Sequence, residues 1–299
     1  MTDLTAHVRV LQPHPGLFAF YDGRIEGQRF ADGPNWVDDG ALSLGIASYA
    51  LVSGDAALVY DTHVSLPHAR LIRQTLEDAG VRRITVVLSH CHLDHVAGTG
   101  VFADCEIIAN SRTFQHLTRD KAAIEAGTLG GMPAIAPLIL PTRVFDNVLD
   151  LQIGPRSVRL IEANIHSDDA TVVWLADSGV LLAGDTVEDT VTYVGDPLNF
   201  GVHLSDIERL SVLRPQHVLP NHGAPEVIAS GGYAATLLPA TAAYIRWLMR
   251  LRAETELADR PLDQVIAAQL ADGSLRWFPP YAAIHRQNVA RTLTAYGHG

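Results

Sequence analysis

Short continuous apolar runs alternate along this chain with stretches in which apolar residues recur at helical spacing. Each continuous run predicts a β-strand, because turn or polar residues bound it. In the first half of the chain the predicted strands cover residues 41–52, 56–60, 83–88 and 105–109. In the second half they cover residues 144–153, 158–163, 171–176, 180–183 and 216–219.

Helices are predicted between and after these strands. The clearest begins near Pro67, which suits a first helical turn, and stops at Gly80. Further helices are expected over 111–118, 204–213 and most of 235–297, with breaks at Pro261 and Pro279-Pro280. Residues 119–142 contain three prolines and Gly130-Gly131, so we expect a loop with helical pieces that forms a lid over a site.

The order of these elements defines the expected fold. Strands occur in two clusters, each accompanied by helices, which is typical of an α/β (α+β) protein with two mixed β-sheets packed together and helices outside. Residues 41–230 would form the core. Residues 1–40 would be an N-terminal extension that contributes to a pocket wall, and residues 231–299 a C-terminal helical extension of the same domain. The aromatic residues of the first segment could equally serve only to pack it against the core, without lining a pocket. These residues are Phe18, Phe20, Tyr21, Phe30 and Trp36.

Composition narrows the class of protein. The net charge of −11 argues against a nucleic-acid partner, because phosphate recognition requires a basic face. Only two cysteines, Cys91 and Cys105, occur among 299 residues, which implies no disulfide framework and fits a cytoplasmic location. The start, Met1-Thr2-Asp3-Leu4, lacks the features of a signal peptide, and no apolar run reaches membrane-spanning length. We therefore expect a small-molecule substrate and no membrane partner.

Candidate chemistry is concentrated in the run Ser89-His90-Cys91-His92-Leu93-Asp94-His95, directly after a predicted strand. Three imidazoles and a carboxylate so close together predict a metal site, and they suit zinc, iron or manganese better than calcium or magnesium. Cys91 lies between two of these histidines, and strand-like alternation would point it away, so we interpret it as a packing residue.

Further candidate site residues follow other predicted strands, where rigid strands aim loop side chains at a common point. These residues are Asp61, His166, Asp185 and His222. Loop, turn or capping roles are the alternatives at each position, above all for Asp61, which would also suit a cap of the following turn.

The ordered set of motifs resembles the metallo-β-lactamase superfamily over about residues 41–225. His90, His92, Asp94 and His95 match the first metal motif of that family. The later positions are matched within His166-Ser167-Asp168-Asp169, Ala183-Gly184-Asp185-Thr186 and Asn221-His222-Gly223. The family more often has glycine before the last histidine, where this chain has Asn221. The resemblance implies a four-layer αββα sandwich.

The resemblance also implies two zinc ions per chain, although iron or manganese would also suit the ligands. His90, His92 and His166 would hold the first ion, and Asp94, His95 and His222 the second. Asp185 would bridge the two ions. Asp61 would orient a ligand imidazole from behind through a hydrogen bond.

A hydroxide between two such ions suits attack on an acyl carbonyl. We therefore predict a metal-dependent hydrolase of an ester, lactone or thioester, in which Asp94 accepts and aligns the proton of the water. Tyr193, shortly after Asp185, would reach the substrate carbonyl, with packing as its alternative. His63 and His203 lie near the proposed site loops and are further candidates for substrate contact.

Two other classes of protein remain open. One is an iron-dependent redox protein of the same fold, similar to persulfide dioxygenases, and the other is a catalytically weak ligand-binding or sensor member. The C-terminal aromatic residues resemble in placement the helical appendage of glyoxalase-II-like members, but a homodimer interface would use them equally well.

Overall fold

Two β-sheets form the centre of the protein, whose computed structural model describes residues 4–298. Residues 1–3, on which most of the signal-peptide prediction rests, and residue 299 lie outside this range. Within residues 4–298 the strands form one sheet of seven and one of five. The first sheet runs in the order β1 (Arg9–His14), β2 (Leu17–Asp22), β3 (Ile46–Ser53), β4 (Ala56–Tyr60), β5 (Arg83–Val87), β6 (Glu106–Asn110) and β7 (Arg143–Phe145). The second runs in the order β12 (His217–Pro220), β11 (Val180–Gly184), β10 (Ser167–Leu175), β9 (Arg156–Ile165) and β8 (Val148–Ile153).

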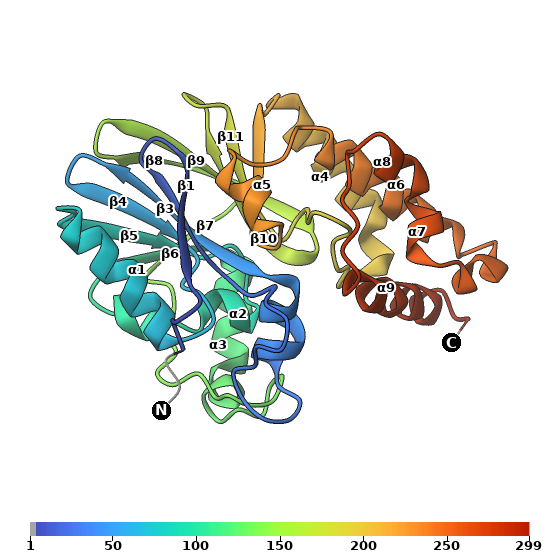
Figure 1. Ribbon diagram of the computed structural model, residues 1–299, viewed down its shortest axis with the longest axis horizontal. Helices are drawn as coiled ribbons and strands as arrows, with labels where there is room; N and C mark the ends of the chain where they lie inside the picture. Colours follow the sequence, from blue (N-terminus) through green and yellow to red (C-terminus); the bar gives the residue numbers. More distant parts are fainter. Residues whose placement is uncertain (1–3, 299) are drawn as a thin grey trace.

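Both sheets are mixed, as expected. Strands β1 to β4 pair antiparallel, whereas β4 to β7 pair parallel. In the second sheet β11 and β12 are parallel and the other pairs antiparallel. Figure 1 shows the two sheets face to face, with helices on the outer faces. The predicted αββα sandwich is therefore confirmed.

Helices cover the outside of the first sheet. In α1 (Leu66–Asp78) the Ser65 side chain accepts a hydrogen bond from the backbone N–H of His68, and Pro67 lies in the first turn. The inward face of α1 buries Ile72 and Leu76 in the same apolar cluster that contains Leu117 and Ile124 of α3 (Ser111–Glu125). The short α2 (Leu93–Val96) begins inside the histidine-rich run.

Helix α3 is longer than the predicted 111–118. Asn110 caps its start by accepting from the backbone N–H groups of Arg112 and Thr113. It continues to Glu125 because Leu117 and Ile124, seven residues apart, both face the core. The irregular segment predicted from residue 119 therefore begins only after this helix.

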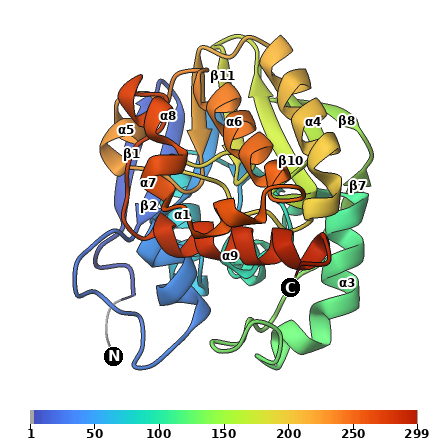
Figure 2. The same ribbon diagram turned by 90° about the vertical axis from the view of Figure 1, so that its right-hand side faces the viewer.

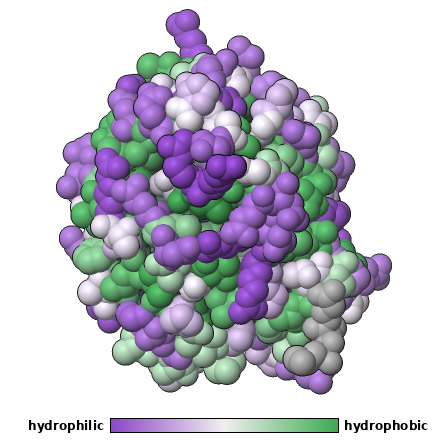
Figure 3. Space-filling view, turned by 90° about the vertical axis from the view of Figure 1, so that its left-hand side faces the viewer, coloured by the Kyte–Doolittle hydropathy of each residue, from purple (hydrophilic) through white to green (hydrophobic). Residues whose placement is uncertain are grey.

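The remaining helices cover the second sheet and the adjoining end of the molecule (Figure 2). They are α4 (Phe200–Val212), α5 (Pro225–Ala229), α6 (Leu237–Arg250), α7 (Leu262–Val265), α8 (Ala267–Ala271) and α9 (Tyr281–Ala295). Buried residues of α4, α6 and α9 join the cluster that fills the space between the sheets. No helix within the described residues is both long enough and apolar enough to cross a membrane. On the face at the left of Figure 1, hydrophilic and hydrophobic residues are interspersed (Figure 3).

Two segments differ from the sequence prediction. Residues 1–40 were expected as an extension, but β1 and β2 are integral strands of the first sheet, because Leu17, Phe20 and Tyr21 are almost completely buried. Residues 144–153 were expected as one strand, but β7 and β8 belong to different sheets. The chain crosses between the sheets at Asn147, whose left-handed φ of 61° breaks the extended conformation.

A buried ion pair joins three distant parts of the chain. The Arg24 guanidinium donates to both carboxylate oxygens of Asp189, at 2.9 and 3.0 Å. It also lies over the ring of Phe278, 3.9 Å from its centroid. The segment after β2, the loop after β11 and the C-terminal region are thereby held together.

Candidate metal centre

Five strand ends deliver the candidate ligands to one place. Asp61 follows β4, the run from His90 to His95 follows β5, and His166 links β9 to β10. Asp185 follows β11 and His222 follows β12. Because both sheets contribute, residues more than one hundred positions apart meet at one end of the sandwich. All seven predicted metal ligands are brought together there, in two adjacent groups.

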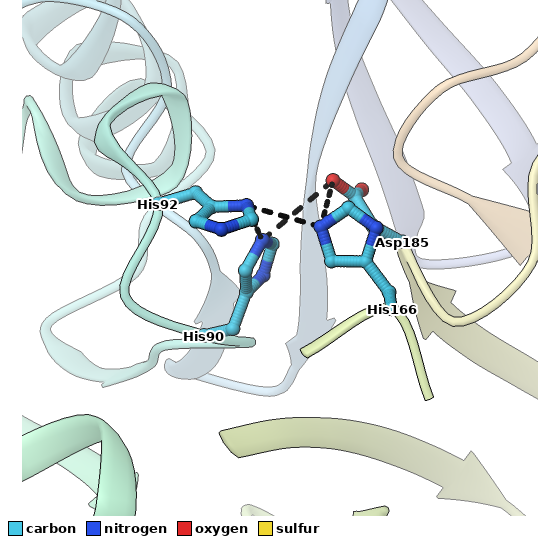
Figure 4. Close-up of side chains that lie close together, drawn as sticks. All are labelled: His90, His92, His166 and Asp185. Atoms are coloured by element: carbon cyan, nitrogen blue, oxygen red, sulfur yellow. Dashed lines mark hydrogen bonds and ion pairs between the residues drawn. The ribbon is translucent and has the colours of Figure 1, made fainter. Parts of the chain in front are cut away.

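The first group consists of His90, His92, His166 and Asp185 (Figure 4). His92 Nδ1 lies 2.9 Å from His90 Nε2 and 3.0 Å from His166 Nε2. Asp185 Oδ2 lies 3.7 Å from His90 Nε2 and 3.6 Å from His166 Nε2. The three imidazoles therefore direct one nitrogen each toward the same small volume.

The second group consists of Asp94, His95 and His222. The Asp94 carboxylate lies 3.5 Å from His95 Nε2 and 3.4 Å from His222 Nε2. Asp185 Oδ2 also lies 3.1 Å from His95 Nε2 and 3.4 Å from His222 Nε2. One carboxylate oxygen is thus shared by the two groups.

The second ring nitrogen of most of these imidazoles has a partner of its own. Asp61 Oδ2 lies 2.9 Å from His95 Nδ1, and the Gly45 carbonyl lies 2.8 Å from His222 Nδ1. The partners of His90 and His166 are hydroxyl groups: Ser89 Oγ lies 2.9 Å from His90 Nδ1, and Thr192 Oγ1 lies 3.3 Å from His166 Nδ1. Such contacts hold each ring in one orientation, as is usual behind metal-binding histidines.

Two of the residues in these loops have strained backbone conformations. Asp61 and His166 adopt left-handed φ values of 66° and 70°, which residues other than glycine rarely adopt. At Gly184 a Cβ atom would lie 2.8 Å from the Tyr60 hydroxyl and 3.2 Å from Ser89 Cβ. Glycine is therefore required immediately before Asp185, because β11 approaches the first sheet so closely there.

Electrostatics differ between the two groups. Burial lowers the pKa of His90 well below 6.5 and that of His166 to about 3, so these imidazoles are neutral and can donate a lone pair. For His95 and His222 burial acts in the same direction, but nearby carboxylates outweigh it and raise the pKa of both rings. Burial alone would raise the pKa of Asp185, yet the facing imidazoles hold it well below its usual range.

These residues fit divalent metal ions. The donors are imidazole nitrogens and carboxylate oxygens, a set that suits zinc, iron and manganese, and tetrahedral bonds of 2.0–2.1 Å, as zinc makes, separate ligand atoms by about 3.3 Å. The ligand atoms of each group lie within 4.8 Å of one another. Moreover, Asp185 Oδ1 is buried and has no hydrogen-bond partner among the described residues. A buried carboxylate oxygen left in this state is costly unless a cation compensates it.

The structure separates the three candidates for substrate contact. Tyr193 lies beside the first group, with its ring 5.6 Å from that of His166. His63 is fully buried and stacks on His68 at 4.4 Å, on the side of α1. His203 is fully buried in α4 beside Phe200. Of the three, only Tyr193 lines the cavity above the metal ligands.

Besides Ser89 and Thr192, two further residues of the centre were not predicted from the sequence. Asn221 Nδ2 donates to Asp61 Oδ2 at 2.5 Å, so it helps to orient the residue behind His95. The Glu188 side chain is buried, and its Oε1 lies 3.9 Å from His166 Nδ1. Burial raises the pKa of the Glu188 carboxyl to about 8. The departure at Asn221 from the expected glycine was a signal for the first, whereas nothing in the local sequence pointed to Glu188.

His203, which is not a candidate metal ligand, allows the effect of a buried histidine on the pH dependence of stability to be tested. Burial lowers its pKa to about 4, although Asp196 and Asp206 act in the opposite direction. Between pH 6.5 and 4 the unfolded chain therefore binds a proton at His203 that the folded chain does not, and stability falls as pH falls. Between pH 7 and 4.5 the free energy of unfolding should fall for both proteins. For the His203→Leu variant this fall should be about 2.5 kcal/mol smaller than for the parent. Urea unfolding at both pH values measures this difference.

The matched control for this test is His7→Leu, at an exposed position. That variant should lose as much stability on acidification as the parent. Equal losses for the parent and for His203→Leu would contradict the prediction, whatever the other acid-sensitive groups contribute.

Fold and site together define an αββα protein with a histidine- and aspartate-rich metal-binding cluster at the strand ends. The sequence model of the metallo-β-lactamase superfamily matches residues 43–244, about two thirds of the chain. The chain therefore belongs to the metallo-β-lactamase superfamily and is a metallo-hydrolase of that fold.

Individual relatives are distant. The probable metallo-hydrolase YqgX of Bacillus subtilis (strain 168) is 22% identical over 189 residues, which are 59% of this chain and 84% of the relative. Among solved structures, the DIM-1 metallo-β-lactamase exposed to ceftazidime is 19% identical, with a TM-score of 0.59 over 81% of this chain and 97% of its own. A metallo-β-lactamase from Pontibacter korlensis is 15% identical, with a TM-score of 0.61 over 80% of this chain and 99% of its own. At such identities the structural likeness establishes the fold alone.

Proposed function

We propose that this chain is a dinuclear zinc-dependent hydrolase that cleaves an ester, lactone or thioester bond in a small molecule. The observation that carries the proposal is the position of Asp185 Oδ2, which lies 3.1–3.7 Å from an imidazole nitrogen of four histidines, two in each group. A carboxylate oxygen shared in this way suits two ions side by side, about 3.5–4 Å apart in hydrolases of this kind.

When bound, such ions would supply an activated water at neutral pH and would polarise the substrate carbonyl. The chain itself supplies the proton acceptor. Asp94 is 18% exposed, lines the cavity and presents its carboxylate beside His95 and His222. Burial alone would raise its pKa, but those two imidazoles hold the carboxyl below its usual range. Asp94 is thus ionised, takes the proton from the attacking water and passes it to the leaving atom.

Tyr193 is the proposed hydrogen-bond donor to the substrate carbonyl oxygen. Burial raises the pKa of its hydroxyl, with the Arg291 guanidinium acting in the opposite direction, so the hydroxyl keeps its proton at neutral pH. Arg291 lies over the ring, 4.7 Å from its centroid, and holds the side chain in place. A donor aimed at the developing oxyanion lowers the barrier to acyl transfer.

The proposed location is the cytoplasm. Cys91 and Cys105 are both unpaired, which suits a reducing compartment.

Metal analysis tests the proposal. The full chain is produced with zinc, iron and manganese all supplied, its metals are quantified, and hydrolysis is measured on a panel of aryl esters, lactones and thioesters. We expect about two zinc ions per chain and turnover of at least one substrate class.

Bound iron with a visible absorption band and no hydrolysis would overturn the proposal in favour of the redox alternative. Full zinc loading without turnover of any panel member would instead favour a sensor or binding role. The Asp185→Ala variant, which removes the shared oxygen, is the matched control and should retain fewer than two ions.

A further inference from the structure

A large cavity opens directly above the metal ligands. Its volume is about 880 Å³, and His92, Asp94 and Tyr193 form part of its wall. Cavities of this size enclose most of a small organic ligand. The cavity therefore extends the site well beyond the space that a reacting carbonyl group needs.

Two loops that are far apart in sequence build the outer wall. Residues 34–41 and 129–132 both line the cavity, and both segments lie at the lower end of the molecule in Figures 1 and 2. The indole Nε1 of Trp36 donates to the Pro133 carbonyl at 2.9 Å and joins the two loops. The cavity is thus enclosed by the segment that the sequence marked as a pocket wall and by the segment that it marked as a lid.

Large apolar side chains dominate this outer part. They come from both loops and from α3, and they are Trp36, Leu117, Ile124, Leu129 and Met132. Leu129 is 38% exposed and Met132 62% exposed, so apolar surface remains in contact with water at the mouth. Covering such surface with an alkyl chain is favourable by about 0.8 kcal/mol for each buried methylene group.

The acidic and basic side chains that line the cavity are unequal in number. The described residues that line it include no lysine and no arginine. They do include three aspartates, which are Asp39, Asp94 and Asp120. The partner of Asp39 is Arg29 and that of Asp120 is Arg119, and neither guanidinium lines the cavity. His116 lines the cavity, but its Nε2 is paired with Asp168 at 2.8 Å. In the outer part of the cavity, away from the metal ligands, an anionic group would lose hydration without meeting a lysine or arginine among the described lining residues.

We propose that the substrate is an uncharged acyl compound whose acyl arm is an apolar chain of roughly six to ten carbons, and that this arm fills the outer cavity. Acyl arms that end in a carboxylate are rejected. The inference rests on the proposed hydrolase function and specifies its substrate class.

Kinetics on a series of 4-nitrophenyl esters test the proposal with the zinc-loaded full chain. The series comprises the acetate, hexanoate and octanoate, together with the octanedioate monoester, whose eight-carbon arm ends in a carboxylate. We expect kcat/KM to rise at least 100-fold from acetate to octanoate, because each buried methylene is worth up to about fourfold. The octanedioate should be at least tenfold poorer than the octanoate, and added salt should narrow that gap by screening the carboxylates.

A charge introduced into the wall provides the matched test. Gln287 lines the cavity at an exposed position of α9, so Gln287→Lys adds a cation with little risk to folding. This variant should raise the octanedioate-to-octanoate ratio of kcat/KM about tenfold. Gln264→Lys, an exposed change that does not line the cavity, should leave the ratio unaltered.

The outcomes separate the two proposals. Equal rates on acetate and octanoate, or a preference for the octanedioate, would overturn the substrate inference while the hydrolase function stands. Absence of turnover on every ester, lactone and thioester by the zinc-loaded chain would overturn the hydrolase function itself.

Discussion

The Asp94→Ala variant of the zinc-loaded protein is expected to lose about 10³-fold in kcat on its best substrate. Asp94 combines two tasks, since its carboxylate contacts both histidines of the second group and also faces the cavity. Removing a positioned general base typically costs 10²–10⁴-fold in rate. Loss of a ligand to the second ion acts in the same direction. Steady-state kinetics and zinc content, measured on the same preparation, give both quantities.

Asp78→Ala is the matched control, because Asp78 is an exposed residue at the end of α1, away from the metal ligands. Its kcat should equal that of the parent. Full turnover by Asp94→Ala would show that another group activates the water and would refute the proposed role. If Asp94→Ala keeps two zinc ions and still loses activity, the loss belongs to proton transfer and not to ion binding.

Removal of the bound ions is expected to lower the melting temperature by on the order of 10–20 °C. The candidate ligands come from loops after β5, β9, β11 and β12, so bound ions would join the two sheets. An ion present at about 1,000 times its Kd stabilises the fold by about 4 kcal/mol, and two ions double that figure. For a chain of this size, each kcal/mol corresponds to a shift of about 2 °C. Thermal unfolding before and after chelation, with metal analysis of both samples, measures the shift.

Addition of zinc to the chelated protein should restore the original melting temperature. The Asp185→Asn variant, which lacks the shared carboxylate, should respond much less to chelator than the parent. An unchanged melting temperature after verified metal removal would mean that the loops hold their positions without ions.

Much of the fold could be read from the hydrophobic pattern. Strands β4 to β6, β9, β11 and β12 match the predicted runs to within about two residues. Strand β3 begins five residues after the start of the predicted run 41–52, because residues 37–42 are helical, and β10 begins four residues before its predicted run. Local patterns failed where pairing partners were distant. Nothing local distinguishes β1 and β2 from packing in an extension, because their place in the sheet depends on the pairing of β2 with the distant β3. The break between β7 and β8 at Asn147 could not be predicted either, because it depends on which sheet each half of the apolar run joins.

The candidate ligands were visible because metal chemistry restricts residue types. Imidazoles and carboxylates placed immediately after apolar strands stand out in a sequence, and their order along the chain resembles that of a known family. The groups that support them were less visible. Asn221 and Thr192 contact Asp61 and His166, which follow other strands, whereas Ser89 contacts the neighbouring His90. Amides and hydroxyls are common in any loop, so none of the three stands out in the sequence.

The sequence by itself determined most of the element order and the residue types of the site, because apolar periodicity and ligand chemistry are local properties of a chain. The αββα arrangement and the complete set of seven converging side chains followed from the family resemblance of the ordered motifs. Tertiary structure alone decided the distances by which one oxygen of Asp185, expected to be shared, lies within reach of both groups. It also decided that Trp36 and the loop after α3 enclose a common cavity, and that no lysine or arginine is among the described residues lining it. Those features arise from distances between segments remote in sequence, and packing, not local pattern, sets such distances.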